Sequence, residues 1–199
     1  MHPYATDSDE RARFVPLVLT VAAIVSAYGL SKLIDASGMQ AKLWWVEFPS
    51  VAGFYALYWK AFDKWVWKWK LLRAIRLVRV PDFAGDWEGE GVSSYIENGE
   101  RKRYNIEVHI EQEWTKFRVS ARTQQSRSES VIGSIIVGDG RYPSISYEYE
   151  NKPSQHAAET MHAHPGMTRL ELTDPTTLDG EYYTGRDRQN YGTLHLRRR

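Results

Sequence analysis

Tyrosine and arginine are the residue types of this sequence best suited to bind a ligand. After residue 85, tyrosines recur within and at the ends of candidate strands, and arginines gather in the segments between them. A tyrosine ring can stack on a nucleobase, and a guanidinium can pair with a phosphate through two parallel hydrogen bonds. The combination suits a small nucleotide-like anion. The alternative is that the tyrosines form an ordinary core and the arginines a solvated rim.

Eight short segments that alternate polar and apolar residues position these side chains. The candidate strands are residues 85–95, 103–111, 115–124, 130–138, 144–151, 166–173, 177–184 and 190–197. Turn residues separate most of them, which is typical of hairpins. The pattern predicts an all-β domain, an eight-stranded antiparallel up-and-down barrel of the lipocalin or calycin type, closed without an exposed edge. An open sandwich is the alternative.

The first candidate strand has the composition of a strand that enters a tight barrel. A period of two begins at Gly85 and places Trp87 and Gly89 on one face. We expect Trp87 to close one end of the barrel, and the glycines to allow the strand to bend. The alternative is an ordinary first strand of any antiparallel sheet.

In an up-and-down barrel, the alternation assigns each inward residue to one end. The end nearest the helices is predicted to be apolar and to hold Trp87, Ile110, Phe117, Leu172, Leu178 and Leu196. The far mouth is predicted to be polar and aromatic, with a basic rim. The predicted ligand-binding residues there are Tyr95, Tyr104, Arg122, Thr123, Tyr149, Tyr182, Thr184 and Arg186.

The segment before the strands has the pattern of a membrane hairpin. Residues 1–13 are polar and read as a flexible tail. Two apolar runs follow, at about residues 14–34 and 43–62, each long enough to predict a transmembrane helix, and a basic, tryptophan-rich extension continues to residue 80. The alternative for the first run is a cleaved signal peptide.

Lysine and arginine counts predict the orientation of this hairpin. Residues 60–79 carry many more basic residues than the connection between the two runs. The positive-inside rule therefore places both termini and the domain at residues 81–199 in the cytoplasm. Glu47 lies inside the second run, where it either reaches the headgroups or acts as an intramembrane carboxylate.

Catalytic and metal chemistry finds little support in the sequence. The chain has no cysteine, which excludes disulfides, zinc-thiolate sites and cysteine nucleophiles. No phosphate-binding glycine loop or nucleophile motif stands out. His162 and His164 lack the spacing of a known metal site, so we expect loop histidines. We predict no catalytic residue, metal, cofactor or nucleic acid polymer as a partner.

One short motif carries a family resemblance. Two apolar helices, a tryptophan- and lysine-rich extension, Pro-Asp-Phe-Ala-Gly-Asp-Trp-Glu-Gly at residues 81–89 and a small β barrel resemble the CD-NTase-associated two-transmembrane β-barrel effectors of bacterial CBASS anti-phage systems. The resemblance implies that the barrel binds a cyclic dinucleotide made by a partner nucleotidyltransferase. It further implies that the subunits then oligomerise, that their helices disrupt the inner membrane and that the infected cell dies.

Two other functions remain open from the residues alone. A membrane-tethered, lipocalin-like carrier of an apolar molecule predicts an apolar cavity that reaches the mouth. A membrane-anchored adaptor predicts a filled interior and an outer surface that binds a protein. The glycines of the first strand leave room that an adaptor does not need.

Overall fold

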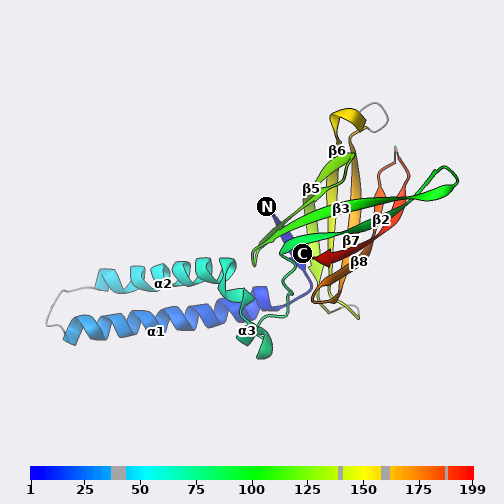
Figure 1. Cartoon of the computed structure of the whole chain (residues 1–199). Helices are drawn as coiled ribbons and strands as arrows, with labels where there is room; N and C mark the ends of the chain where they lie inside the picture. The colour runs from blue at the N-terminus through cyan, green and yellow to red at the C-terminus, as the bar shows by residue number, and fades with distance from the viewer. Residues whose placement is uncertain (37–43, 139–140, 158–161, 187) are drawn as a thin grey trace. The chain divides into compact units, whose positions relative to one another are not determined.

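The chain folds into two compact units. The computed structural model describes residues 1–36, 44–138, 141–157, 162–186 and 188–199. The helical unit comprises Asp9–Arg79, and the β unit combines Met1–Ser8 with Val80–Arg199. Both are drawn in Figure 1.

Two packed helices make up most of the helical unit. A π-helical turn, Glu10–Phe14, leads into α1, Val15–Ala36, and α2 spans Trp44–Lys64. A 3₁₀ turn, Val66–Lys68, and the short α3, Lys70–Ala74, complete it. Near the middle of the helices, the Ser26 and Tyr58 hydroxyls are hydrogen-bonded at 2.7 Å, which ties α1 to α2.

Within the described residues, one helical segment is long and apolar enough to cross a membrane. It is Glu10–Ala36, with a mean hydropathy of 2.0. Its large apolar side chains are exposed within the unit, Leu17 and Leu33 among them. The first predicted span therefore meets this test and the second does not, because Trp, Tyr, Pro, Glu47 and Lys60 lower the hydropathy of α2. The Glu47 side chain lies outside the described residues.

Eight strands of the β unit lie where the alternation predicts them, with ends moved by a few residues. They are β2 Gly85–Glu97, β3 Glu100–Gln112, β4 Lys116–Arg122, β5 Ser126–Ile136, β6 Ser144–Pro153, β7 His164–Asp174, β8 Thr177–Thr184 and β9 Tyr191–Arg198. Each pairs antiparallel with the next along the chain, and β9 pairs antiparallel with β2. In most of these strands the buried residues recur every second position, as the period of two requires, whereas β5 buries only Ile135.

A ninth strand corrects the prediction of a flexible tail. The N-terminal β1, His2–Thr6, pairs antiparallel with β4 and parallel with β5. Tyr4 is buried, and its hydroxyl donates to the Trp114 carbonyl at 2.9 Å. The tail prediction is wrong for these residues because the environment that orders them comes from strands more than a hundred residues away in the chain.

The sheet closes on itself in the order β1-β4-β3-β2-β9-β8-β7-β6-β5, and β4 also pairs with β5. Trp87 packs where the first and last of the eight strands meet. Its indole nitrogen donates to the Phe83 carbonyl at 2.9 Å, and the Arg198 guanidinium lies 4.5 Å from the centroid of its ring. Gly89 allows close approach of β2 to β9, because a Cβ there would lie 1.9 Å from the His195 carbonyl oxygen. Gly85 has a φ of 134°, which only glycine adopts readily.

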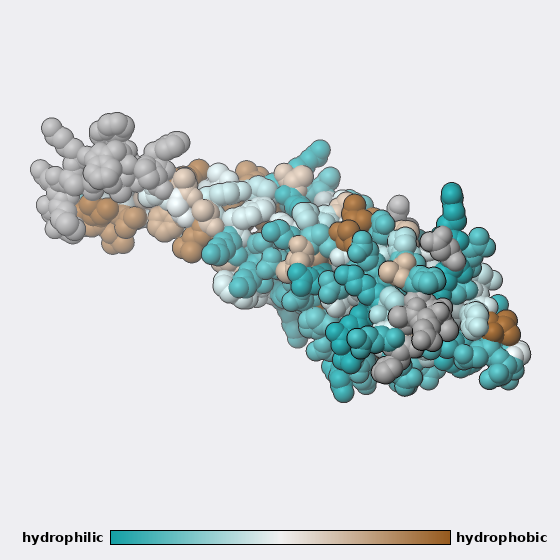
Figure 2. Space-filling view, turned by 90° about the horizontal axis from the view of Figure 1, so that it is seen from above, coloured by the Kyte–Doolittle hydropathy of each residue, from teal (hydrophilic) through white to brown (hydrophobic). Residues whose placement is uncertain are grey.

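Most residues predicted for the apolar end are buried. Trp87, Ile110, Phe117, Leu178 and Leu196 are buried, whereas Leu172 is half-buried. Figure 2 shows that the visible face of the β unit is mostly hydrophilic and that hydrophobic residues gather on the helices. The alternating strands therefore turn their apolar residues inward, away from this surface.

Candidate functional site

A large cavity opens at the end of the sheet opposite Trp87. Its volume is about 930 Å³, within the range of about 300–1,000 Å³ typical of small-molecule sites. The β4–β5 and β8–β9 turns contribute to its rim through Gln124 and Asn190, and the first part of β3 contributes Lys102. The predicted mouth is therefore a cavity.

Four tyrosines form the aromatic wall of this cavity. Tyr147, Tyr149 and Tyr182 are buried, and Tyr104 is half-buried. The Tyr104 and Tyr182 rings meet edge to face with centroids 6.4 Å apart, and the Tyr147 and Tyr149 rings are tilted at the same separation. Aromatic faces and edges at this spacing attract each other, so the rings support one another around the cavity.

Three of these rings lie against glycines on neighbouring strands. The facing pairs are Gly91 with Tyr104, Gly166 with Tyr149 and Gly192 with Tyr182. A Cβ at each of these glycines would lie within 2.3–2.6 Å of a ring atom. Each ring thus lies over the backbone of the next strand, an arrangement that only a residue without a side chain permits.

Burial favours the neutral form of three of these phenols. Desolvation by burial raises the pKa of Tyr147 to about 12. Burial likewise raises the pKa values of Tyr104 and Tyr149, and neighbouring tyrosines add to both shifts. A neutral phenol can donate a hydrogen bond to a ligand oxygen, which a phenolate cannot do.

Buried polar groups also line the cavity. Ser93, Asn151, His164 and Thr168 are all buried. The Nδ1 of His164 lies 2.9 Å from the His162 carbonyl oxygen, which can only accept, so Nδ1 donates this hydrogen bond. The cavity therefore offers both donors and acceptors. Among the described residues, no group of His, Asp and Glu residues is arranged to hold a metal ion.

The structure brings together six of the eight predicted ligand-binding residues. Tyr95, Tyr104, Thr123, Tyr149, Tyr182 and Thr184 line the cavity. The two threonine hydroxyls also shape its turns. Thr123 accepts from the Ser126 amide at 3.1 Å, and Thr184 donates to the Asn190 carbonyl at 2.9 Å. These two side chains hold the rim in place.

Neither predicted arginine lines the cavity. Arg122 is exposed and borders a separate cleft of about 360 Å³ that Arg127 also lines. Arg186 is exposed and outside the cavity lining. The arginine that does line the cavity is Arg188. Its charge acts on the Tyr149 phenol.

Sequence reasoning left several lining residues outside the predicted site. Tyr147 shares the inward face of β6 with Tyr149, so the alternation was a sufficient signal for it. Arg188 had no such signal, because it lies in a turn that is set by backbone bonds from Arg188 and Gln189 to Gly185. Two further cations line the cavity near acidic partners. Lys102 lies 2.9 Å from Glu97, and Arg103 lies 3.9 Å from Glu90.

Two comparisons relate the chain to described proteins. Residues 78–198 match the family model described as "Cap15, cyclic dinucleotide receptor domain". The chain is also 31% identical over 150 residues to CD-NTase-associated protein 15 of Yersinia aleksiciae, covering 75% of this chain and 69% of that protein. The family match spans the strands that build the cavity.

The first prediction concerns the Gly91–Tyr104 pair. Gly91→Ala should destabilise the unsubstituted chain by about 1–3 kcal/mol, because the new methyl overlaps the Tyr104 ring. In a Tyr104→Leu background the same change should be neutral or stabilising by up to about 1 kcal/mol, because alanine suits a strand better than glycine. Denaturant unfolding of the four chains measures both values. An equal effect in the two backgrounds would contradict the contact.

The second prediction concerns pH. The raised tyrosine pKa values mean that the folded state binds phenolic protons more tightly than the unfolded state. The contribution of this proton binding to the free energy of unfolding is complete below pH 10, and it should be lost as the pH rises from about 10 to 12. Unfolding at a series of pH values, with phenolate absorbance as a second signal, measures the loss. Tyr147→Phe should make it smaller, and an unchanged slope would contradict this assignment.

Proposed function

The chain belongs to the Cap15 family of CBASS effectors, which sense cyclic dinucleotides, and from this premise we propose that its cavity holds the cyclic dinucleotide. The bases stack on the tyrosine wall and the phosphates pair with rim cations. The observation that carries this proposal is the cavity of about 930 Å³, in which four tyrosines, buried polar groups and Arg188 converge.

The chemistry of the lining supports this ligand. A cyclic dinucleotide offers two flat bases and two anionic phosphodiesters. Tyr104, Tyr149 and Tyr182 offer ring surfaces, which supply about 1–3 kcal/mol for each stacked base. Arg188 offers a planar, permanently charged donor group that matches phosphate. The positive charge of Arg188 acts to lower the pKa of the Tyr149 phenol, so we place the base and phosphate subsites side by side there.

The two alternatives fit the cavity less well. An apolar carrier needs an apolar interior, but polar groups supply much of this lining, including Asn105, Asn151 and Thr168. An adaptor needs no interior space at all. The cavity therefore favours a receptor for a small polar molecule with aromatic parts.

The place of the N-terminal strand supports a two-pass membrane topology. Both β1 and Val80–Arg199 belong to the β unit, so they lie on one side of any membrane. If the Glu10–Ala36 segment crosses that membrane, the chain must cross back before Val80. The α2 helix has the length for this return, since its 21 residues extend about 32 Å. The bond between Ser26 and Tyr58 pairs polar groups within such a hairpin.

Basic residues on the C-terminal side of α2 orient the hairpin. Lys60 and Lys64 lie in the last turns of α2, and Lys68, Lys70, Arg73, Arg76 and Arg79 follow it. By the positive-inside rule, they favour a β unit in the bacterial cytoplasm and a connection between α1 and α2 on the outside. In this orientation the cavity faces the compartment in which a nucleotidyltransferase makes its product.

Binding acts on the membrane by stabilising an assembly. A ligand favours one state only by binding that state more tightly than the other. The nucleotide therefore binds the oligomeric effector more tightly than the monomer. The assembled helices then disrupt the inner membrane, and the infected cell dies before the phage is released.

The third prediction separates two neighbouring arginines. Arg188→Ala should weaken cyclic dinucleotide binding by about 1.5–3 kcal/mol, a loss of roughly 10- to 150-fold, because a charged hydrogen bond to phosphate is removed. Arg186→Ala, two residues away and outside the cavity, should leave the affinity unchanged. Calorimetric titration of the chain in lipid nanodiscs, with a panel of cyclic dinucleotides and linear dinucleotides, measures both. No binding to any cyclic species by a folded chain would refute the proposed site.

The fourth prediction tests the topology. Because the chain has no native cysteine, a maleimide labels only the introduced one. In spheroplasts, a membrane-impermeant maleimide should label Asp35→Cys, at the end of α1, without permeabilisation. It should label Asp174→Cys, on the exposed end of β7, only after permeabilisation. Labelling of both from the same side would exclude the proposed hairpin.

A further inference from the structure

The N-terminal strand is attached to the sheet differently from every other described strand. Strands β2 to β9 follow one another as antiparallel neighbours, whereas β1 reaches β4 and β5 from a distant part of the chain. It pairs over two residues with β4 and over three with β5, and the second pairing is parallel. Both ladders are short, and parallel pairing is slightly less stable per residue than antiparallel pairing.

A gap between β4 and β5 holds this strand. The two strands pair directly from Ser120–Arg122 to Arg127–Glu129 and then diverge. We call the space beyond this point the slot, bounded by Lys116 and Phe117 on β4 and by Gly133–Ile135 on β5. The polar group at its apex is Ser130, whose Oγ accepts from the Val119 amide at 2.9 Å and lies 2.8 Å from His2 Nε2.

The slot is shaped for the β1 sequence. Tyr4 enters the core beside Phe117, with ring centroids 5.4 Å apart, and its hydroxyl donates to Trp114. Gly133 faces Tyr4, and a Cβ there would lie 2.5 Å from Cζ of Phe117, so the glycine makes room for the aromatic pair. The occupant that fits this site is therefore the His2–Thr6 segment itself.

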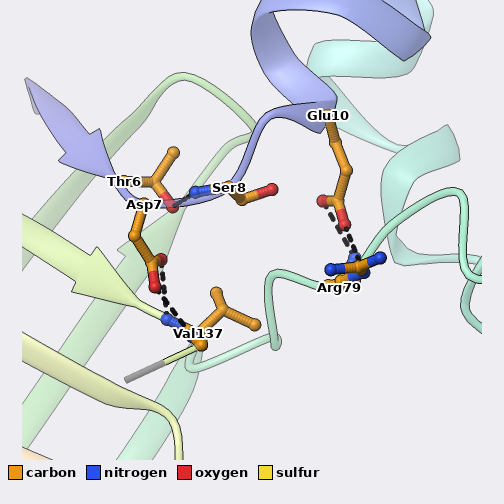
Figure 3. A network of polar contacts seen from close by, with 7 residues as sticks. Thr6, Asp7, Ser8, Glu10, Arg79 and Val137 are labelled. Atoms are coloured by element: carbon orange, nitrogen blue, oxygen red, sulfur yellow. Dashed lines mark hydrogen bonds and ion pairs between the residues drawn. The ribbon is translucent and has the colours of Figure 1, made fainter.

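A capping contact fixes the position of β1 along the slot. The two carboxylate oxygens of Asp7 accept from the amides of Val137 at 2.8 Å and Gly138 at 2.7 Å, just beyond the end of β5. Figure 3 shows this carboxylate directed at the Val137 backbone. In the same figure Glu10, the second residue after Ser8, contacts Arg79 within the helical unit.

The covalent connection does not force β1 into the slot of its own chain. At most ten residues connect each later strand to the next, but residues 9–79, the whole helical unit, lie in sequence between β1 and the rest of the sheet. The same contacts can form with the β1 of another molecule. A strand exchanged between identical chains keeps every contact of the closed form, so its cost is low when copies are concentrated.

We propose that the slot is a site for contact between copies of this chain, in which the β1 strand of one molecule occupies the slot of a second. Withdrawal of β1 leaves the facing edges of β4 and β5 with unpaired backbone groups. An edge of this kind is the form of sheet that accepts another strand. The exchange needs no nucleotide, so it is independent of the proposed cavity ligand.

Engineered cysteines test the exchange in the full chain. Ala5 and Ser134 face each other across β1 and β5 on the outer side of the sheet. Chains carrying Ala5→Cys alone and Ser134→Cys alone, co-expressed and oxidised in the membrane, should form a covalent heterodimer at twice the 23.1 kDa mass of the chain. Pairing Ala5→Cys with Arg169→Cys, on the exposed face of β7, controls for chance collision and should give none.

The double variant Ala5→Cys/Ser134→Cys calibrates this result. It should cross-link within one chain, which shows that the geometry permits a disulfide. Efficient cross-linking within the double variant, together with no heterodimer from the two single variants, would overturn the proposal. A heterodimer with Arg169→Cys equal to that with Ser134→Cys would overturn it as well.

A second measurement does not depend on disulfide geometry. In a full chain with Tyr4→Ala, the native β1 loses its main anchor, so a labelled peptide of residues 1–8 should bind the slot in trans. The affinity of this peptide, measured by the rise in its fluorescence anisotropy, should be at least tenfold higher than that of the same peptide carrying Tyr4→Ala. Equal anisotropy with the two peptides would show that the slot does not select β1 in trans and would also count against the exchange.

Discussion

The close approach of tyrosine rings to glycine backbone is the constraint on which the cavity depends. At Gly91, Gly166 and Gly192 a single added methyl group would overlap the ring that faces it. Because each ring lies over the glycine of a neighbouring strand, the rings stay close to the wall and leave the centre of the cavity open. A sheet with alanine at these positions would push the rings inward. The three glycines thus keep the cavity open, because they leave room for the tyrosine rings at its wall.

The same sheet joins this cavity to the beginning of the chain. The turn between β4 and β5 contributes Thr123 and Gln124 to the cavity, and the far halves of the two strands hold β1. Only Ala5, Thr6, Asp7 and Ser8 separate the buried Tyr4 of β1 from the helical unit. A change in the spacing of β4 and β5 at the cavity therefore bears directly on the strand that leads into α1.

Family membership and the lining of the cavity support the same ligand on independent grounds. The family match rests on sequence over residues 78–198, whereas the aromatic, polar and cationic lining is a property of the folded sheet. The fold alone would not separate a nucleotide receptor from a lipocalin-like carrier, since both use closed sheets. The decision between them rests on particular side chains, chiefly Asn151, Thr168 and Arg188.

The sequence by itself determined the elements whose signal is local. Alternation located β2 to β9 and the apolar end around Trp87, because a strand with one buried face must repeat every two residues. It also placed Tyr104, Tyr149 and Tyr182 inside, and the same alternation already turned Arg122 outward. Only the tertiary structure decided the rest. Tyr4 is ordered by a slot built from β4 and β5, and the backbone of the β8–β9 turn brings Arg188 rather than Arg186 to the cavity. Both outcomes depend on contacts between residues distant in sequence or on turn geometry, and neither leaves a periodic trace in the chain.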